Sequence, residues 1–281
     1  MKIIISVILM YLWLLCVPSF AEEKSYSFKD FTEIEFSTAG SLYLTQSDQY
    51  RVVLEGTKEQ IEDIVIQKNG NLLVIKQEWS LFGLGDVDLN GITVLVDVPR
   101  LEAITASSSG SIHGQTRFAN LEGLTIATSS SGDISLSAEA DRVEVISSSS
   151  GSIRLDGIVA SLFLETASSG DIEFSGEITE KLNATNTSMG KIRCELDTDT
   201  VVPESRLKVR SMGNIIVSGQ GKHIEASSSS AGKLLLKDFL CENMKLDLTS
   251  SGNAVVNVRG TLDMNTSSSG RVVTQGSPLM K

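Results

Sequence analysis

Ser107-Ser108-Ser109-Gly110-Ser111-Ile112 is the first copy of a short phrase that decides the fold. Close copies begin at Ser129, Ser148 and Ser267, and looser copies fill the interval before the last of them. The glycines of the nine copies are 18 to 23 residues apart, with a mean spacing of 20: Gly110, Gly132, Gly151, Gly170, Gly190, Gly213, Gly232, Gly252 and Gly270. A period of this length is typical of a solenoid, in which each repeat forms one coil.

Apolar residues recur at fixed distances from each glycine. Positions +2 and +4 after the glycine and positions −6 and −8 before it are mostly apolar; around Gly132 they are Ile134, Leu136, Ile126 and Leu124. A spacing of two residues indicates a strand. Equal positions of stacked coils then form continuous apolar ladders. The sequence therefore predicts an all-β fold, a single-stranded right-handed parallel β-helix with about 20 residues per coil.

The glycine is expected at a corner between two strands. There it supplies either a positive φ or room for a close backbone approach. The small serines before it can satisfy backbone groups or bond to serines of the next coil. The residue after the glycine changes from acidic to basic along the repeats, and we interpret this position as serving solubility and register: Ser111, Asp133, Ser152, Asp171, Lys191, Asn214, Lys233, Asn253 and Arg271.

The chain is expected to divide into a leader and one continuous domain. Lys2, an apolar run over 3–17 and small residues before Glu22 predict a signal peptide over residues 1–21. Residues 22–100 are expected to form an N-terminal β-rich cap with the first strands, and residues 101–281 the solenoid. Within the cap, Thr57–Gln60 fits a capping box that opens a short helix. Asn69-Gly70 predicts a β-hairpin.

The net charge of the chain excludes some classes of partner. Without the leader the chain has 23 Lys and Arg and 35 Asp and Glu, a formal charge of 23 − 35 = −12. Such acidity argues against nucleic acid or an anionic membrane surface as partner.

Cys194 and Cys241 fall two coils apart, about 10 Å, which is too far for a disulfide. We expect two buried free thiols.

Residues for catalysis or metal binding are sparse. His113 and His223 fall many coils apart and cannot share a metal or a catalytic triad. Four charged residues were considered as a polysaccharide-cleaving set, but we expect no convincing column from them: Asp133, Arg154, Asp156 and Glu173. The sequence therefore predicts no catalytic, cofactor or metal site.

One segment interrupts the strand pattern. Residues 78–90 carry Trp79, Leu81, Phe82 and Leu84 among glycines. One interpretation is a loop that folds back over the end of the solenoid. The other is an exposed apolar surface that contacts a partner or a second subunit.

The first part of the chain resembles a known family. Phe31-x-x-Ile34-x-Phe36-x-x-x-Gly40, then Tyr50–Glu55, Asn69–Ile75 and the entry Val98-Pro99-Arg100-Leu101, are similar in order and spacing to the family described as "putative auto-transporter adhesin, head GIN domain". Its members are exported bacterial proteins. The resemblance implies a parallel β-helix-like fold without catalytic residues.

The function expected from these observations is binding. We expect an exported, non-enzymatic, adhesin-like β-solenoid that contacts a cell-surface glycan or an envelope protein, in the periplasm or at the surface of a Gram-negative bacterium. One alternative is a periplasmic structural or assembly protein. A second is a polysaccharide lyase or hydrolase on the same fold. The sequence leaves homo-oligomerisation open.

Overall fold

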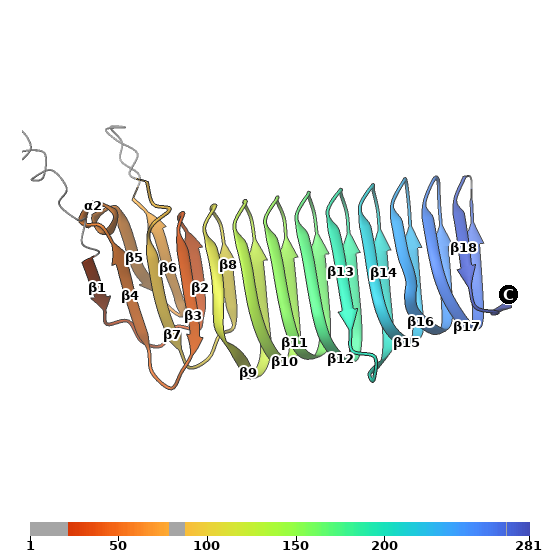
Figure 1. Ribbon diagram of the computed structural model, residues 1–281, viewed down its shortest axis with the longest axis horizontal. Helices are drawn as coiled ribbons and strands as arrows, with labels where there is room; N and C mark the ends of the chain where they lie inside the picture. The colour runs from red at the N-terminus through yellow and green to blue at the C-terminus, as the bar shows by residue number, and fades with distance from the viewer. Residues whose placement is uncertain (1–21, 79–87, 268) are drawn as a thin grey trace, which may run out of the picture.

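The computed structural model describes residues 22–78, 88–267 and 269–281. These residues form 19 strands of one sheet and one short helix. The sheet winds into an elongated stack of about nine parallel coils, with the N-terminal strands at one end and β18 at the other (Figure 1). The predicted all-β solenoid with about 20 residues per coil is confirmed.

Most coils of the solenoid are single long strands that bend in the middle. The strand β11 begins directly after Gly151 and ends just before the next corner; it pairs in parallel with β10 below and β12 above. The strands of the repeats are β8 (Ala103–Ala106), β9 (Ser111–Thr128), β10 (Asp133–Ser147), β11 (Ser152–Thr166), β12 (Asp171–Asn186), β13 (Lys191–Leu196), β14 (Val201–Val209), β15 (Asn214–Ser228), β16 (Lys233–Leu248), β17 (Asn253–Thr266), β18 (Arg271–Gln275) and β19 (Leu279–Met280).

Each coil contributes to two walls of the solenoid. We call the strand segments that follow the corner glycines wall A, and the segments that precede the next corner wall B. The bend between them opposite the corner contains Gly157, Gly176 and Gly219, whose φ angles of 147°, 129° and 118° favour glycine. Register shifts in several strand pairs lie near this bend, as between Val159 and Ser161. On each wall, side chains alternate between the interior and the outside.

The interior contains the ladders that the sequence predicts. In the coil of β11, Ile153, Leu155, Leu162 and Leu164 are at most 2% exposed, and their counterparts in neighbouring coils stack directly above and below them. A further inward position, four residues before the corner glycine, is polar in five coils and also buried: Thr128, Ser147, Thr166, Asn186 and Ser228. The sequence analysis did not predict this polar ladder.

Three members of the buried polar ladder form hydrogen bonds with the corner glycine of their own coil. The hydroxyls of Ser147 and Ser228 donate to the carbonyls of Gly151 and Gly232 at 3.1 and 2.9 Å, and the amide of Asn186 donates to its own corner glycine. Ser148 donates its hydroxyl to the Thr128 carbonyl of the coil below at 3.1 Å. The expectation that hydroxyls near the corner satisfy backbone groups is therefore confirmed.

The corner glycines serve close packing between coils. None of the nine repeat glycines, all within the described residues, has a positive φ. A Cβ added at Gly132 would lie 2.7 Å from the carbonyl oxygen of Gly110 and 2.8 Å from that of Ser108, both in the coil below. Of the two roles expected for these glycines, the structure shows the close backbone approach.

The N-terminal elements close one end of the solenoid. Their bounds are β1 (Glu22–Tyr26), β2 (Glu33–Ser37), β3 (Ser41–Gln46), β4 (Arg51–Gly56), α2 (Lys58–Glu62), β5 (Ile64–Asn69), β6 (Leu72–Gln77) and β7 (Thr93–Val98). The strands β2 and β3 form a coil of their own, because β2 pairs in parallel with β6 and β8, and β3 with β7 and β9. Both local predictions for this region are confirmed: Thr57 and Gln60 form the capping box of α2, and β5 and β6 form an antiparallel hairpin.

The two cysteines of the described region are free and buried, as predicted. Burial raises the pKa of each thiol to about 12. Cys194 pairs across the sheet with Val217, whereas Cys241 pairs with Gly221 and Val258. The two sulfur atoms therefore belong to different ladders of different coils.

No helix in the described part of the chain is long and apolar enough to cross a bilayer.

Candidate functional site

The apolar segment considered as a contact surface cannot be placed. Trp79, Leu81, Phe82 and Leu84 lie outside the described residues. The flanking strands β6 and β7 stack on β2 and β3, so β6 ends and β7 begins at the same edge of the solenoid as the corners of the repeats. The role of the segment stays a prediction.

The residues considered for chemistry are distributed as follows. His113 lies on wall A, where its ring stacks on Tyr43 with centroids 5.3 Å apart, while His223 lies on wall B. Of the four charged residues considered as a cleaving set, Arg154 and Glu173 both stand three residues after their glycine. They are cross-strand neighbours on β11 and β12, joined by an ion pair of 3.4 Å. The other carboxylate oxygen of Glu173 lies 3.8 Å from the Lys191 ammonium, so both of its oxygens face a cation.

Asp133, a third member of that set, and Asp171, which occupies the equivalent position two coils further on, bind the backbone of the next coil. Asp133 accepts a hydrogen bond from the backbone N–H of Ser152 in the next coil at 3.0 Å. Asp171 does the same for Lys191, at 3.0 Å, and also forms an ion pair with the Lys191 ammonium at 3.1 Å. Asp156 accepts from the hydroxyl of Ser137 at 2.9 Å. These contacts support the interpretation of the position after the glycine as a register position.

A charged groove lies on wall B near the C-terminal end of the solenoid. It is a shallow cavity of about 320 Å³ that crosses β12, β14, β15, β16 and β17 and reaches Lys281. A second cavity of about 290 Å³ continues it toward the corner and shares Arg206, Glu225 and Lys245 with it. We call the two cavities together the wall-B groove.

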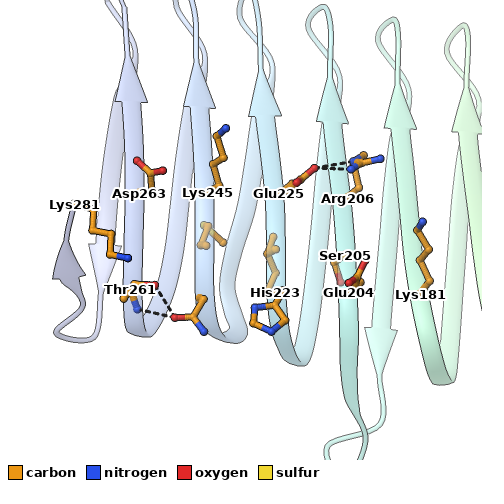
Figure 2. A pocket seen from close by; sticks show the side chains of 13 residues that line it. Lys181, Glu204, Ser205, Arg206, His223, Glu225, Lys245, Thr261, Asp263 and Lys281 are labelled. Atoms are coloured by element: carbon orange, nitrogen blue, oxygen red, sulfur yellow. Dashed lines mark hydrogen bonds and ion pairs between the residues drawn. The ribbon is translucent and has the colours of Figure 1, made fainter.

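The groove is built from two outward columns of side chains in register. The column nine residues before each glycine is Lys181, Glu204, His223, Asn243 and Thr261. The column seven residues before it is Asn183, Arg206, Glu225, Lys245 and Asp263. Asn183 lies in register with the second column but lines neither cavity. Figure 2 shows the other members as two rows of side chains from neighbouring coils, which project outward from the wall. Because the strands pair in parallel without insertions here, the side chains of each column follow one another at the strand spacing of about 4.8 Å.

Two interactions organise the groove. Arg206 donates two hydrogen bonds to one oxygen of Glu225, at 2.9 and 2.6 Å, and this bond together with the guanidinium charge lowers the pKa of Glu225. Asn243 accepts from the hydroxyl of Thr261 at 2.6 Å and from its N–H at 3.2 Å. Its amide orientation is thereby fixed, with the NH₂ group left to donate elsewhere.

The remaining charges of the groove are not neutralised in the same way. Among the described residues, Lys245 and His223 form no ion pair, and neither does Asp263. The groove thus presents the unpaired ammonium of Lys245, the His223 imidazole, the Asp263 carboxylate and a fixed amide donor. No group of three or more His, Cys, Asp and Glu residues in the described ranges is arranged to hold a metal ion.

The sequence analysis missed the groove because, of the outward positions, it aligned only the one directly after the glycine. Aligning the residues that stand nine and seven positions before each corner glycine would have shown both columns. It would not have shown that they line a cavity, since this depends on the curvature of the wall and on side-chain lengths.

Comparisons with known proteins agree with this architecture. The model of the family described as "putative auto-transporter adhesin, head GIN domain" matches residues 30–197 and 194–278. The fold is similar to that of a putative adhesin from Parabacteroides distasonis, with 14% identity, a TM-score of 0.61, and coverage of 94% of this chain and 98% of that chain. It is also similar to a putative adhesin from Parabacteroides merdae, with 14% identity, a TM-score of 0.58, and coverage of 94% and 97%.

No curated protein matches the sequence significantly. The two structural likenesses, at 14% identity, concern the fold alone. The family model, in contrast, matches almost all of residues 30–278, including the cap and the repeats. The chain belongs to the head GIN domain family of auto-transporter adhesin-like proteins.

Proposed function

We propose that this protein is an exported, non-enzymatic binding module whose wall-B groove binds a carbohydrate chain at a bacterial surface. The family description and the names of the two structural neighbours support an adhesin-like role. The observation that carries the proposal is the groove itself, which crosses five coils and ends at Lys281. Its length suits an extended polymer better than a compact ligand.

The groups of the groove suit sugar hydroxyls and carboxylates. Lys245 and His223 supply donors, and Asn243 supplies a fixed NH₂ group beside them. Asp263 and Glu204 supply acceptors for hydroxyl hydrogens. Each contact at such an exposed site is weak, so affinity comes from repeating it along the rigid wall.

The proposal is tested by glycan-array screening, followed by calorimetry with the glycans that bind. The double variant His223→Ala with Lys245→Ala should weaken binding at least about tenfold, because it removes two donors from the centre of the groove. The matched control, His113→Ala with Lys233→Ala, removes the same residue types from wall A and should bind like the unmodified protein. Equal binding by both double variants and the unmodified protein would refute the groove as the site.

The same glycans discriminate binding from cleavage. Bound polysaccharide incubated with the protein should yield no new reducing ends. If reducing ends appear and Glu204→Gln or Asp263→Asn abolishes them, the protein is a glycan-cleaving enzyme and the non-enzymatic proposal fails.

A further inference from the structure

Wall A carries a flat array without carboxylates on its last four coils. The strands β15, β16, β17 and β18 lie side by side at the C-terminal end of the solenoid (Figure 1). Their outward positions one and three residues after the corner glycine are paired in register across all four strands. We call these eight residues the wall-A patch: Asn214, Ile216, Lys233, Leu235, Asn253, Val255, Arg271 and Val273.

The patch has an amphipathic layout. The column three residues after the corner glycines is an apolar ladder of Ile216, Leu235, Val255 and Val273. Val273 is 42% exposed and the others are half-buried. Beside this ladder stand Lys233 and Arg271, which are exposed and, in the described part of the chain, have no ion-pair partner. The equivalent columns of the earlier coils contain acidic and basic residues together, so the ladder is a local feature.

Exposed methionines border the patch at the corners. Met189 and Met212 stand directly before the glycines of two successive corners, and each is 58% exposed. They are among the few large apolar side chains of the described region with such exposure. The nearest wall-A carboxylates, Glu195 and Asp238, are each already paired with a cation, at 3.2 and 3.4 Å. These two carboxylates therefore do not offset the charges of Lys233 and Arg271.

The charge of the chain is distributed unevenly along the axis. Residues 205–281 contain 10 Lys and Arg and 5 Asp and Glu, a net charge of 10 − 5 = +5. Residues 22–204 contain 13 and 30, a net charge of 13 − 30 = −17. Since charges are screened beyond about 8 Å at physiological salt, a partner at wall A of the last coils experiences chiefly Lys233, Lys237 and Arg271 against the single carboxylate of Asp238. The overall acidity of −12 therefore does not exclude an anionic partner at this end.

We infer that the wall-A patch docks on an anionic lipid surface. Lys233 and Arg271 bind the phosphate groups of lipid heads, and the apolar ladder contacts the boundary between heads and acyl chains. A planar partner fits, because the four strands are in register and the patch is one continuous face of a sheet. Docked in this way, the protein lies flat with wall B, and hence the wall-B groove, turned away from the lipid.

The experiment measures co-sedimentation of the purified chain with vesicles. One set contains equal parts of phosphatidylglycerol and phosphatidylcholine, and the other contains phosphatidylcholine alone. The unmodified protein should partition onto the anionic vesicles at about 0.1 M salt and be released at about 1 M. It should partition much more weakly onto phosphatidylcholine alone. Absence of binding to the anionic vesicles at low salt overturns the inference.

Matched variants locate the docking surface. Lys233→Glu with Arg271→Glu should lower partitioning at least about 20-fold, since each cation near an anionic surface contributes about fivefold. Lys222→Glu with Arg259→Glu makes the same change of charge at exposed bends of β15 and β17, which also belong to the patch, and should lower partitioning only a few-fold. Equal losses in the two double variants would mean a non-specific charge effect and overturn the inference.

The apolar ladder is tested by Val255→Thr with Val273→Thr, which keeps side-chain shape and outward direction. This variant should bind several-fold more weakly at every salt concentration, with an unchanged circular dichroism spectrum. Light scattering of the vesicle-free protein provides the last check. If the unmodified protein is a dimer and the Lys233→Glu, Arg271→Glu variant is a monomer, the patch is an interface between copies and the lipid inference fails.

Discussion

Replacement of one corner glycine by alanine gives a direct measure of how the coils are held at their spacing. In Gly132→Ala the new Cβ would lie 2.7 and 2.8 Å from two backbone oxygens of the coil below. Ordinary carbon–oxygen contacts begin at about 3.3 Å, so the corner must open by about 0.5 Å. Both oxygens belong to backbone that is itself stacked on a lower coil, and neither can move without disturbing its neighbours.

The cost follows from the loss of close packing. Overpacking of a filled site typically costs about 1–3 kcal/mol, and opening the corner also lengthens nearby bonds such as that from the Ser129 N–H to the Ala106 carbonyl at 3.1 Å. For a chain of this size, about 1–3 kcal/mol corresponds to a fall in Tm of about 3–10 °C. Thermal unfolding followed by circular dichroism at the strand band measures it.

Gly123→Ala is the matched control. Gly123 also lies in the solenoid, but the nearest atom to its added Cβ is the Arg142 oxygen at 3.9 Å, an ordinary contact, and its φ is not positive. Alanine there should leave Tm unchanged or raise it slightly, because it restricts the unfolded chain. If Gly132→Ala melts within about 1 °C of the unmodified protein, or if Gly123→Ala falls as far, close approach is not the reason for the glycine period.

Three other predictions follow from buried and paired groups. Cys194 and Cys241, whose pKa values burial raises to about 12, should have a thiolate fraction of ~10⁻⁴ at pH 8 and resist a thiol reagent until the protein is unfolded; rapid labelling of the native protein would contradict this. The pKa of Glu225, lowered by the hydrogen bond from Arg206, should rise toward its ordinary value in Arg206→Ala when followed by NMR. Because the folded pKa is the lower one, the pair's small contribution to stability should be present at neutral pH and be lost as pH falls through that pKa; an unchanged titration would refute the pairing in solution. Thr166→Val should raise stability by about 1 kcal/mol in a denaturant titration, since the buried Thr166 hydroxyl has no partner; a loss of similar size would show that this hydroxyl is bonded.

The inward side of the fold was predictable because stacking repeats one constraint in every coil. A residue such as Ile153 must match Ile134 and Ile172 directly below and above it. The period of the glycines and the period-two alternation therefore determine which residues are buried. The thiol of Cys194, at position +4 after Gly190, could be placed from the same offsets.

The order of the first coils could not be predicted, because it depends on pairing between distant segments. The coil of β2 and β3 lies between the strands β6 and β7 on one side and β8 and β9 on the other, although β6 and β7 come later in the chain than β2. Local patterns identify each of these strands but do not select its neighbour. The corner at Gly40 also differs from the repeat corners, because Gly40 has a positive φ of 92° and none of the nine repeat glycines has a positive φ.

The wall-B groove was missed for a related reason. Arg206, Glu225 and Lys245 occupy outward positions that stacking leaves free, so no period in residue type reveals them. Only their register, read from the inward residues, shows that they are neighbours. The pairing of Arg154 with Glu173 was missed in the same way, although their equal offset from the glycine was available in the sequence.

Inward and outward positions of a coil have different roles, and this difference has a consequence for function. The interior ladders, the buried polar position and the corner glycine hold a coil in the stack, while the outward positions of the two walls are not needed for that purpose. Outward residues can therefore change without loss of the fold. Outward side chains of successive coils can then form a binding surface that runs along the solenoid axis. The last coils use both walls: a mixed-charge groove on wall B and a carboxylate-free patch on wall A. Because the two surfaces share the same strands, the solenoid can hold a ligand on one side while its other side is fixed to a second surface, without any moving part.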